Sequence, residues 1–353
     1  MRGSLVGLGA AVVVAAAAVV VPLTVMEPSV AGSPVAADVP PVTTPSPAEP
    51  PAEPACAGEL VGSGSSLARN AVADVAAALE RACPDSVVDY APVGSGGGLQ
   101  QFTSGATGFA VVDRPLAESE MPAVRARCEA QAYPFVAHPV MVRYHVAGVG
   151  DLNLDAPTLT KIFGGAITTW NDPAIVEQNP DTALSARPIV VVGRGDESAT
   201  TAAFQQYLAT AGGWTSGAGT TFTGKATQTA QGDSGMLAMI ENTEGAIGYL
   251  TAAEGTRSQV LRIGGVAPEP DAVATTITSA LPGGGLALDP ADVYGADPAT
   301  GAYPLVIVSY AVTCDDDAAA RDFLLASLTV RDGGSGYVFP ADEWADRLVA
   351  ALQ

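Results

Sequence analysis

Three segments of the chain share one pattern of apolar and polar positions. In each, an apolar, strand-like run leads into glycine and serine and then into a helix with one apolar face. The apolar runs are residues 60–62, 87–93 and 188–192. The last is a continuous run, typical of a strand buried on both faces. Successive strand–helix units predict a parallel α/β sheet whose ligands bind outside the carboxyl ends of the strands.

Elsewhere along the chain the alternation of strands and helices is interrupted and later resumes. Further helices are predicted at residues 121–130, 159–163, 236–241, 271–280, 318–328 and 342–352, and further strands at 109–112 and 245–249. Two longer apolar runs, 133–146 and 304–312, predict strands that cross between two lobes. We therefore expect an α/β protein with two discontinuous lobes. Lobe I is residues 56–138 plus 303–353, and lobe II is residues 139–302.

The N-terminal part of the chain is not globular. Arg2 precedes an uncharged run over residues 3–26, which predicts a signal peptide or a signal anchor within residues 1–31. Residues 27–54 hold nine prolines, so residues 32–55 are interpreted as a semi-extended linker, a spacer from a membrane or through a wall. Either way we expect an exported protein, secreted or held at the cell surface by an N-terminal membrane anchor.

Four cysteines in an exported chain favour two disulfides. A helix that returns antiparallel to its strand brings Cys83 near Cys56, and Cys128 and Cys314 flank the two long strands on lobe I. These pairings, Cys56–Cys83 and Cys128–Cys314, are our predictions. Because the chain has no C-x-x-C pair and its two histidines are not grouped with cysteines, we expect no zinc, no haem and no other cofactor.

The chain carries 37 acidic and 16 basic residues, for a formal net charge of −21. This charge argues against binding to nucleic acid and against adsorption to anionic lipid. It is consistent with solubility outside the cell. It does not exclude a small anion, because local dipoles and one arginine can hold a buried oxyanion.

The glycine-rich segment 94–98 is the clearest candidate for such a site. A strand that runs through glycine and serine into a helix leaves free backbone N–H groups at the helix N-terminus, which suits an anion. A glycine-rich turn without a ligand is the alternative. Residues 193–200 repeat the design with an arginine, although Ser198 or Thr200 could simply cap a helix and Arg194 could form a surface ion pair.

Three segments together resemble the phosphate-binding proteins of ABC phosphate importers. They are G-S-G-S-S-L (62–67), V-G-S-G-G-G-L-Q-Q (93–101) with V-V-D-R-P-L (111–116), and V-V-G-R-G-D-E-S-A-T-T (191–201). Segments 162–173, 244–250 and 303–310 add support in the same order along the chain. The resemblance implies a two-lobed periplasmic-binding-protein fold of type II, with a mixed sheet in each lobe. It also implies inorganic phosphate and ABC permease subunits as partners and no enzymatic activity, and we expect a monomer.

Residue by residue, the resemblance implies a set of phosphate contacts: Ser66, Leu67, Ser95, Asp113, Arg194, Ser198, Ala199 and Thr200. Leu67 stands where the family has an aromatic residue and Ala199 where it has glycine, and both keep a backbone N–H donor. Asp196 corresponds to an aspartate that orients the arginine. Arg114 follows Asp113 where some members have a small residue, and it either adds a second cation to the site or pairs with Asp113.

Asp113 would discriminate among oxyanions. An ionised carboxylate has no hydrogen to donate, so it requires a proton on the ligand, which phosphate carries and sulfate at neutral pH does not. A site built around such a hydrogen bond rejects the analogue that lacks it by roughly 10⁴-fold.

A few motifs and properties of the chain also fit other functions. Gly232-Asp-Ser-Gly235 resembles the nucleophile segment of a chymotrypsin-type serine hydrolase, but His138 lies in an apolar strand, and helix N-capping by Asp233 and Ser234 is favoured. No complete G-x-G-x-x-G or G-K-[ST] motif occurs. A binding protein for sulfate or molybdate, or a phosphate scavenger or sensor without a permease, remains an alternative.

Overall fold

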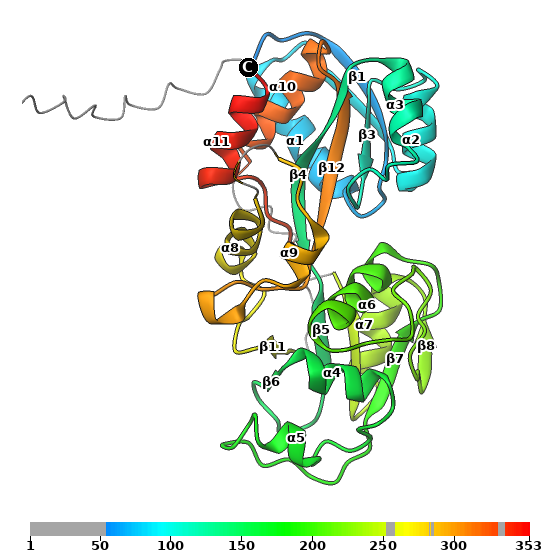
Figure 1. Cartoon of the computed structure of the whole chain (residues 1–353), viewed down its shortest axis with the longest axis vertical. Coiled ribbons are helices and arrows are strands. Elements are labelled where there is room, and N and C mark those ends of the chain that lie inside the picture. The colour runs from blue at the N-terminus through cyan, green and yellow to red at the C-terminus, as the bar shows by residue number, and fades with distance from the viewer. Residues whose placement is uncertain (1–53, 252–257, 282, 284–285, 331–335) are drawn as a thin grey trace, which may run out of the picture. The chain divides into compact units, whose positions relative to one another are not determined.

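The computed structural model describes residues 54–251, 258–281, 283, 286–330 and 336–353. The predicted signal segment and nearly all of the predicted linker lie outside these residues. Within the described part of the chain, no helix combines the length and the apolar character needed to cross a membrane. The described chain is built on two five-stranded sheets and a small two-stranded one (Figure 1).

The first sheet has the strand order β2-β1-β3-β12-β4. Its members are β1 (Glu59–Gly64), β2 (Val87–Ala91), β3 (Phe109–Val112), β4 (Ala130–Pro139) and β12 (Val306–Cys314). Strand β1 is parallel to β2 and β3, whereas β12 is antiparallel to β3 and β4. The sheet is therefore mixed. The antiparallel strand, β12, is fourth in the order and comes from far along the chain.

Helices cover both faces of this sheet. Figure 1 shows α1 (Arg69–Ala82) and α10 (Ala318–Ser327) on one side, and α2 (Ser95–Thr103) and α3 (Met121–Arg127) on the other. The C-terminal helix is α11 (Asp342–Ala351). Close packing sets the start of α2: a Cβ at Gly98 would lie 2.3 Å from the Cα of Gly64, so a side chain there would push α2 away from β1.

The second sheet has the order β10-β5-β9-β7-β8. Its members are β5 (Met141–His145), β7 (Val190–Arg194), β8 (Gln228–Ala230), β9 (Ala246–Leu250) and β10 (Gln259–Val260). Strand β7 is parallel to β8 and β9, and β5 is antiparallel to β9 and β10. Helices α4 (Ala156–Phe163), α6 (Ala199–Ala211) and α7 (Gly232–Glu241) belong to this region.

Smaller elements complete the described chain. Strands β6 (Asn153–Leu154) and β11 (Arg262–Ile263) form the two-stranded sheet. The remaining helices are α5 (Pro173–Val176), α8 (Pro270–Ala280), α9 (Pro290–Tyr294) and the 3₁₀ turn η1 (Pro298–Thr300). The predicted α/β architecture, with two mixed sheets flanked by helices, is confirmed.

The long strand predicted over residues 133–146 is not continuous. It is divided at Val140 into β4 of the first sheet and β5 of the second. The Val140 N–H donates to the carbonyl of Leu305, just before β12. The point where the chain leaves the first sheet after β4 therefore lies beside the point where it returns before β12. Apolar periodicity could not show this break, because both strands are buried along nearly their whole length.

Both predicted disulfides are confirmed. Cys56 is bonded to Cys83, with Cα atoms 5.3 Å apart, and Cys128 to Cys314, with Cα atoms 5.8 Å apart. The second links residues 186 positions apart and ties the end of α3 to the end of β12.

Candidate anion-binding cleft

A cleft of about 1220 Å³ is lined by residues from both five-stranded sheets and the helices that follow them. All ten residues singled out in the sequence line it: Ser66, Leu67, Ser95, Asp113, Arg114, Arg194, Asp196, Ser198, Ala199 and Thr200. They come from four separate stretches of the chain. The carboxyl ends of parallel strands meet at one edge of a sheet, which brings β1 and β3, and separately β7, to the cleft.

On the first sheet, two strand–helix junctions face the cleft. The Ser66 hydroxyl donates to the carbonyl of Pro92 over 3.2 Å. Helix α2 begins at Ser95, after Gly94 with φ of 85°, so the glycine-rich segment forms the first turn of the helix. The sequence pattern predicts a helix only after this glycine-rich segment, so α2 starts earlier than expected. First-turn N–H groups have no partner within a helix and remain suited to an anion.

Asp113 follows β3 and is held by serine hydroxyls. Ser95 Oγ donates to Asp113 Oδ2 over 3.2 Å, and Ser309 Oγ on β12 donates to Asp113 Oδ1 over 2.7 Å. Burial raises the pKa of Asp113, and hydrogen bonds from Ser65, Ser309 and Ser95 partly oppose that rise. The carboxyl group is thus oriented by neutral donors, and no cation of the described residues is bonded to it.

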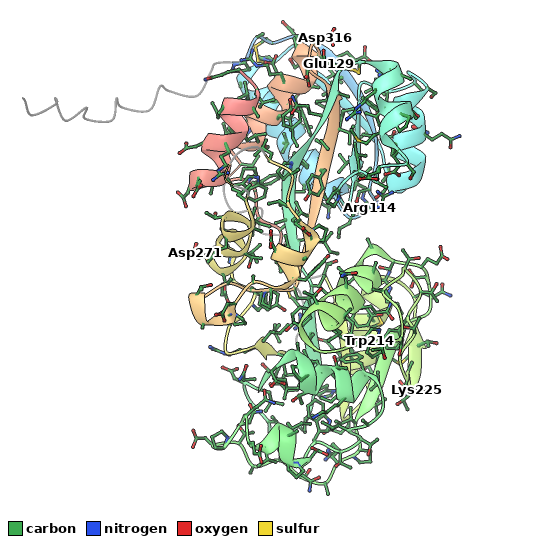
Figure 2. All side chains as sticks on the ribbon, viewed as in Figure 1. Arg114, Glu129, Trp214, Lys225, Asp271 and Asp316 are labelled. Carbon is green, nitrogen blue, oxygen red and sulfur yellow. A yellow bond between two sulfur atoms is a disulfide. The ribbon has the colours of Figure 1, made fainter. Side chains whose placement is uncertain are left out.

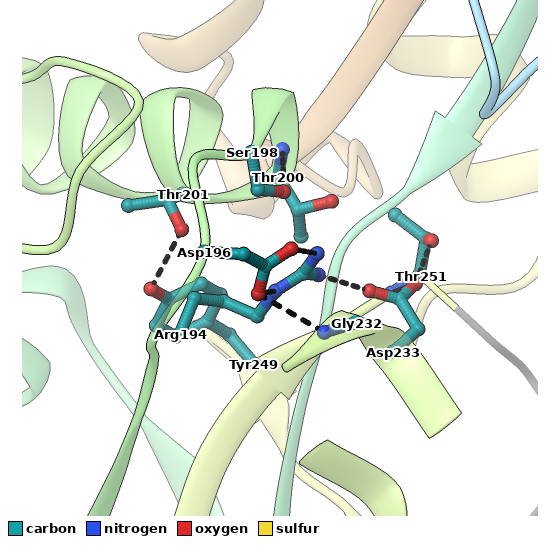
Figure 3. Close-up of polar contacts among 9 residues, drawn as sticks. All are labelled: Arg194, Asp196, Ser198, Thr200, Thr201, Gly232, Asp233, Tyr249 and Thr251. Carbon is teal, nitrogen blue, oxygen red and sulfur yellow. Dashed lines mark hydrogen bonds and ion pairs between the residues drawn. The ribbon is translucent and has the colours of Figure 1, made fainter. Parts of the chain in front are cut away.

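Arg194, at the end of β7, is held by two carboxylates (Figure 3). Its Nε and Nη2 donate to the two oxygens of Asp196 over 3.0 and 2.7 Å, and its Nη1 donates to Oδ1 of Asp233. Only 7% of the Arg194 side chain is exposed. Hydrogen bonding to Arg194 lowers the pKa of Asp196 to about 2, so this carboxyl stays ionised near neutral pH.

Helix α6 starts beside this arginine. Ser198 is its N-cap, with Oγ accepting the N–H of Thr200 over 3.1 Å, so the capping role considered for Ser198 is observed. Farther along α6, Thr201 Oγ1 lies 2.9 Å from the hydroxyl of Tyr249 on β9. The Tyr249 ring stacks on Phe204 with centroids 4.3 Å apart, which fixes α6 against the sheet.

Residues 49–327 match the family model described as the PBP superfamily domain. Phosphate-binding protein PstS 3 of Mycobacterium leprae is 39% identical over 323 residues, covering 84% of this chain and 87% of that protein. The chain belongs to the family of PstS phosphate-binding proteins. PstS2 of Mycobacterium bovis is 38% identical over 300 residues, covering 77% of this chain and 80% of the relative.

Solved structures show the same fold. A phosphate-binding protein from Stenotrophomonas maltophilia aligns with a TM-score of 0.55 at 21% identity, covering 83% of this chain and 94% of that one. An ABC-type phosphate transport receptor from Vibrio cholerae aligns with a TM-score of 0.54 at 18% identity, covering 80% and 100%. The chain therefore has the two-lobed, type II periplasmic-binding fold of PstS-like proteins, and the two lobes are joined by strands.

Arg114 does not pair with Asp113, which was one of the two roles left open for it. Its guanidinium forms an ion pair with Glu120, with Nη2 and Oε1 2.6 Å apart, and half of its side chain is exposed (Figure 2). Hydrogen bonds to Glu120 account for this position, because Glu120 Oε2 also accepts the N–H of Ala117 and closes a local turn.

Asp233 does not cap α7, contrary to the sequence-based prediction. The N-cap is Gln231, without a side-chain cap, and Asp233 instead accepts from Arg194, from the Thr251 N–H over 2.8 Å and from the Thr251 hydroxyl. The only sequence signal for this role was an acidic residue directly after a strand and a glycine, Gly232.

Ser234 lines the cleft, but the contacts needed for a serine hydrolase are not formed. His138 lies in β4, buried and edge-on to Tyr337. Burial lowers its pKa to about 3. His145 instead lies 3.8 Å from Glu244. Neither histidine lines the cleft.

Proposed function

We propose that this protein is an extracytoplasmic solute-binding protein that captures inorganic phosphate in the cleft for an ABC importer. The observation that carries the proposal is that Asp113, an acceptor held by neutral serine hydroxyls, lines the same cleft as Arg194 and two helix N-termini. Donors from the guanidinium and the helix N-termini, together with the Asp113 acceptor, match a tetrahedral oxyanion that still bears a proton. The names of the relatives, phosphate-binding proteins, support the same ligand.

In this proposal, both lobes supply donors. Lobe I provides the Ser66 and Ser95 hydroxyls and the N–H of Leu67. Lobe II provides the Arg194 guanidinium, the Ser198 and Thr200 hydroxyls and the N–H of Ala199. Residues 56–138 plus 303–353 and residues 139–302 move as two bodies, so that closing the cleft completes the ligand shell.

Asp113 makes the site selective. It is oriented by serine hydroxyls that each bond one carboxylate oxygen, and each oxygen keeps acceptor capacity for a proton on the ligand. Phosphate provides that proton, whereas sulfate would place two acceptors face to face. The protein acts as a binding protein rather than an enzyme.

Export supports the same function. The N-terminal apolar run and the two disulfides are suited to a compartment outside the cytoplasm. The protein is held by a membrane anchor or secreted, works as a monomer and passes its ligand to permease subunits.

The test is isothermal titration of phosphate, arsenate and sulfate into protein purified from a host that exports it with its disulfides formed. We expect phosphate and arsenate to bind tightly and sulfate to bind at least roughly 10⁴-fold more weakly. Tight binding of sulfate or molybdate in place of phosphate would refute the proposal.

A further inference from the structure

Two carboxylates pair with Arg194, although one would be enough to hold its guanidinium in place. Asp196 alone holds Nε and Nη2 in a two-bond arrangement, which fixes the plane of the guanidinium. Asp233 then takes a third N–H through Nη1. A guanidinium has five N–H donors, so these three bonds leave two for a ligand.

Asp233 is itself firmly placed. Its Oδ2 accepts both the backbone N–H and the hydroxyl of Thr251, while its Oδ1 accepts from Arg194 (Figure 3). Asp233 lines the cleft together with Asp113 and Asp196.

The inner charges of the cleft therefore do not balance. Three carboxylates line the cleft with one largely buried cation, Arg194, so the net charge of this set is −2 when all are ionised. The other charged side chains lining the cleft are exposed, and solvent screens them: Arg69, Arg114 and Glu197.

Among the residues that the structure describes, no other cation on the elements packed around α7 is bonded to Asp233. On β5, the Arg143 guanidinium donates to Ser258, and His145 lies beside Glu244. On β9, burial raises the pKa of Tyr249 to about 12, so it is neutral. The donors of β7 and α6 are Arg194 itself and uncharged groups.

We propose that Asp233 is a specificity-determining residue that limits the charge of the ligand, so that the cleft prefers the phosphate monoanion to the dianion. The proposal rests on the proposed function. Asp113 requires at least one proton on the ligand, and both phosphate species satisfy it. The negative charge of Asp233 adds a repulsion that grows with ligand charge, and this repulsion separates the two species.

The experiment compares the wild-type protein with Asp233→Asn by titration of inorganic phosphate between roughly pH 5.5 and roughly pH 8.5, where phosphate loses its second proton. We expect wild-type affinity to fall by about tenfold or more as the dianion replaces the monoanion. In Asp233→Asn this fall should shrink by about tenfold, and sulfate, a dianion throughout, should bind more tightly.

Two control variants separate charge from bracing. Asp271→Asn removes one charge from an exposed position on α8 that does not line the cleft (Figure 2), and it should reproduce the wild-type pH profile. Thr251→Val removes a hydroxyl bond to Asp233 but keeps the carboxylate, so any loss of affinity should be the same at every pH. If Asp233→Asn folds poorly, judged by its thermal midpoint, Asp233→Ser serves as the uncharged variant.

The outcomes distinguish the two proposals. A wild-type protein that binds no phosphate at any pH refutes the proposed function, and this inference with it. A wild-type protein that binds phosphate with a pH profile unchanged in Asp233→Asn and Asp233→Ser refutes the inference alone. A uniform loss of affinity in these variants, or a flattened profile in Thr251→Val, also refutes it, because Asp233 would then act only as a brace.

Discussion

The hydroxyl of Ser309 donates to Oδ1 of Asp113 over 2.7 Å, although the two residues are 196 positions apart in the chain. Ser309 lies in β12, where the pairing with β4 shifts register between Ser309 and Tyr310. A β-bulge re-aims the side chains beside it. Asp113, the proposed selectivity group directly after β3, is therefore oriented by an irregular point in a strand that also pairs with β4.

We expect Ser309→Ala to weaken phosphate binding. The change removes one of the serine donors that hold the Asp113 carboxylate, at a cost of about 1–3 kcal/mol, and loosens its orientation. Titration calorimetry with phosphate is the measurement. Ser327→Ala is the matched control, because Ser327 is also buried but bonds only to Leu324 within its own helix region. Equal affinity in both variants would exclude a role for Ser309.

Replacing Asp113 by Asn keeps its size but supplies a hydrogen-bond donor. Phosphate should then bind less tightly or about equally, whereas sulfate should gain, because a clash of acceptors becomes a hydrogen bond. The measurement is the ratio of phosphate to sulfate affinity in parallel titrations. An unchanged ratio would mean that Asp113 is not the discriminating group. Pairing with Arg114 could not then explain its role, since Arg114 is bonded to Glu120.

Arg194→Ala should weaken every oxyanion together, by about 2–5 kcal/mol for a buried charged partner. Part of this loss comes from Asp196 and Asp233, whose carboxylates would be left facing the ligand. Phosphate and arsenate titrations report the effect. Arg262→Ala is the control, since Arg262 forms an exposed pair with Asp151 at 3.5 Å and lies outside the cleft. A change in the phosphate-to-sulfate ratio without loss of affinity would contradict this role.

His138 should make stability depend on pH. Burial lowers its folded-state pKa to about 3, below the value of about 6.5 in the unfolded chain. The unfolded state therefore binds the extra proton first, and stability falls as pH drops from about 6.5 toward about 3. We expect a slope of up to about 1.4 kcal/mol per pH unit from this group.

Urea unfolding at several pH values, for the wild-type protein and His138→Phe, measures that slope. The variant should lose less stability between about pH 6.5 and about pH 4, with pH 7.5 as the common reference because the imidazole is then mostly neutral in both states. Identical slopes in the two proteins would show that His138 is protonated as readily in the folded state as in the unfolded one.

Much of this protein was predictable from its sequence, because the informative signals are local. Apolar runs that lead into Gly and Ser predict strand–helix junctions, and α2 does start in such a segment. The antiparallel return of α1 predicted the Cys56–Cys83 bond. Asp113 and Arg194 each lie at the end of an apolar strand, β3 in the first sheet and β7 in the second. In each sheet, the carboxyl ends of parallel strands share one edge.

Other features depended on contacts between distant segments. The partner of Arg114 is Glu120 rather than its neighbour Asp113, and Asp233 contacts Arg194 instead of capping its own helix. Ser309 reaches Asp113 only because β12 returns to pair with β3. The sequence by itself determined which short segments could offer donors to an anion, since helix starts and strand ends are set by neighbouring residues. Only the tertiary structure decided which carboxylates and hydroxyls meet those donors, because a side chain's partner is chosen by the packing of strands and helices that lie far apart in the chain.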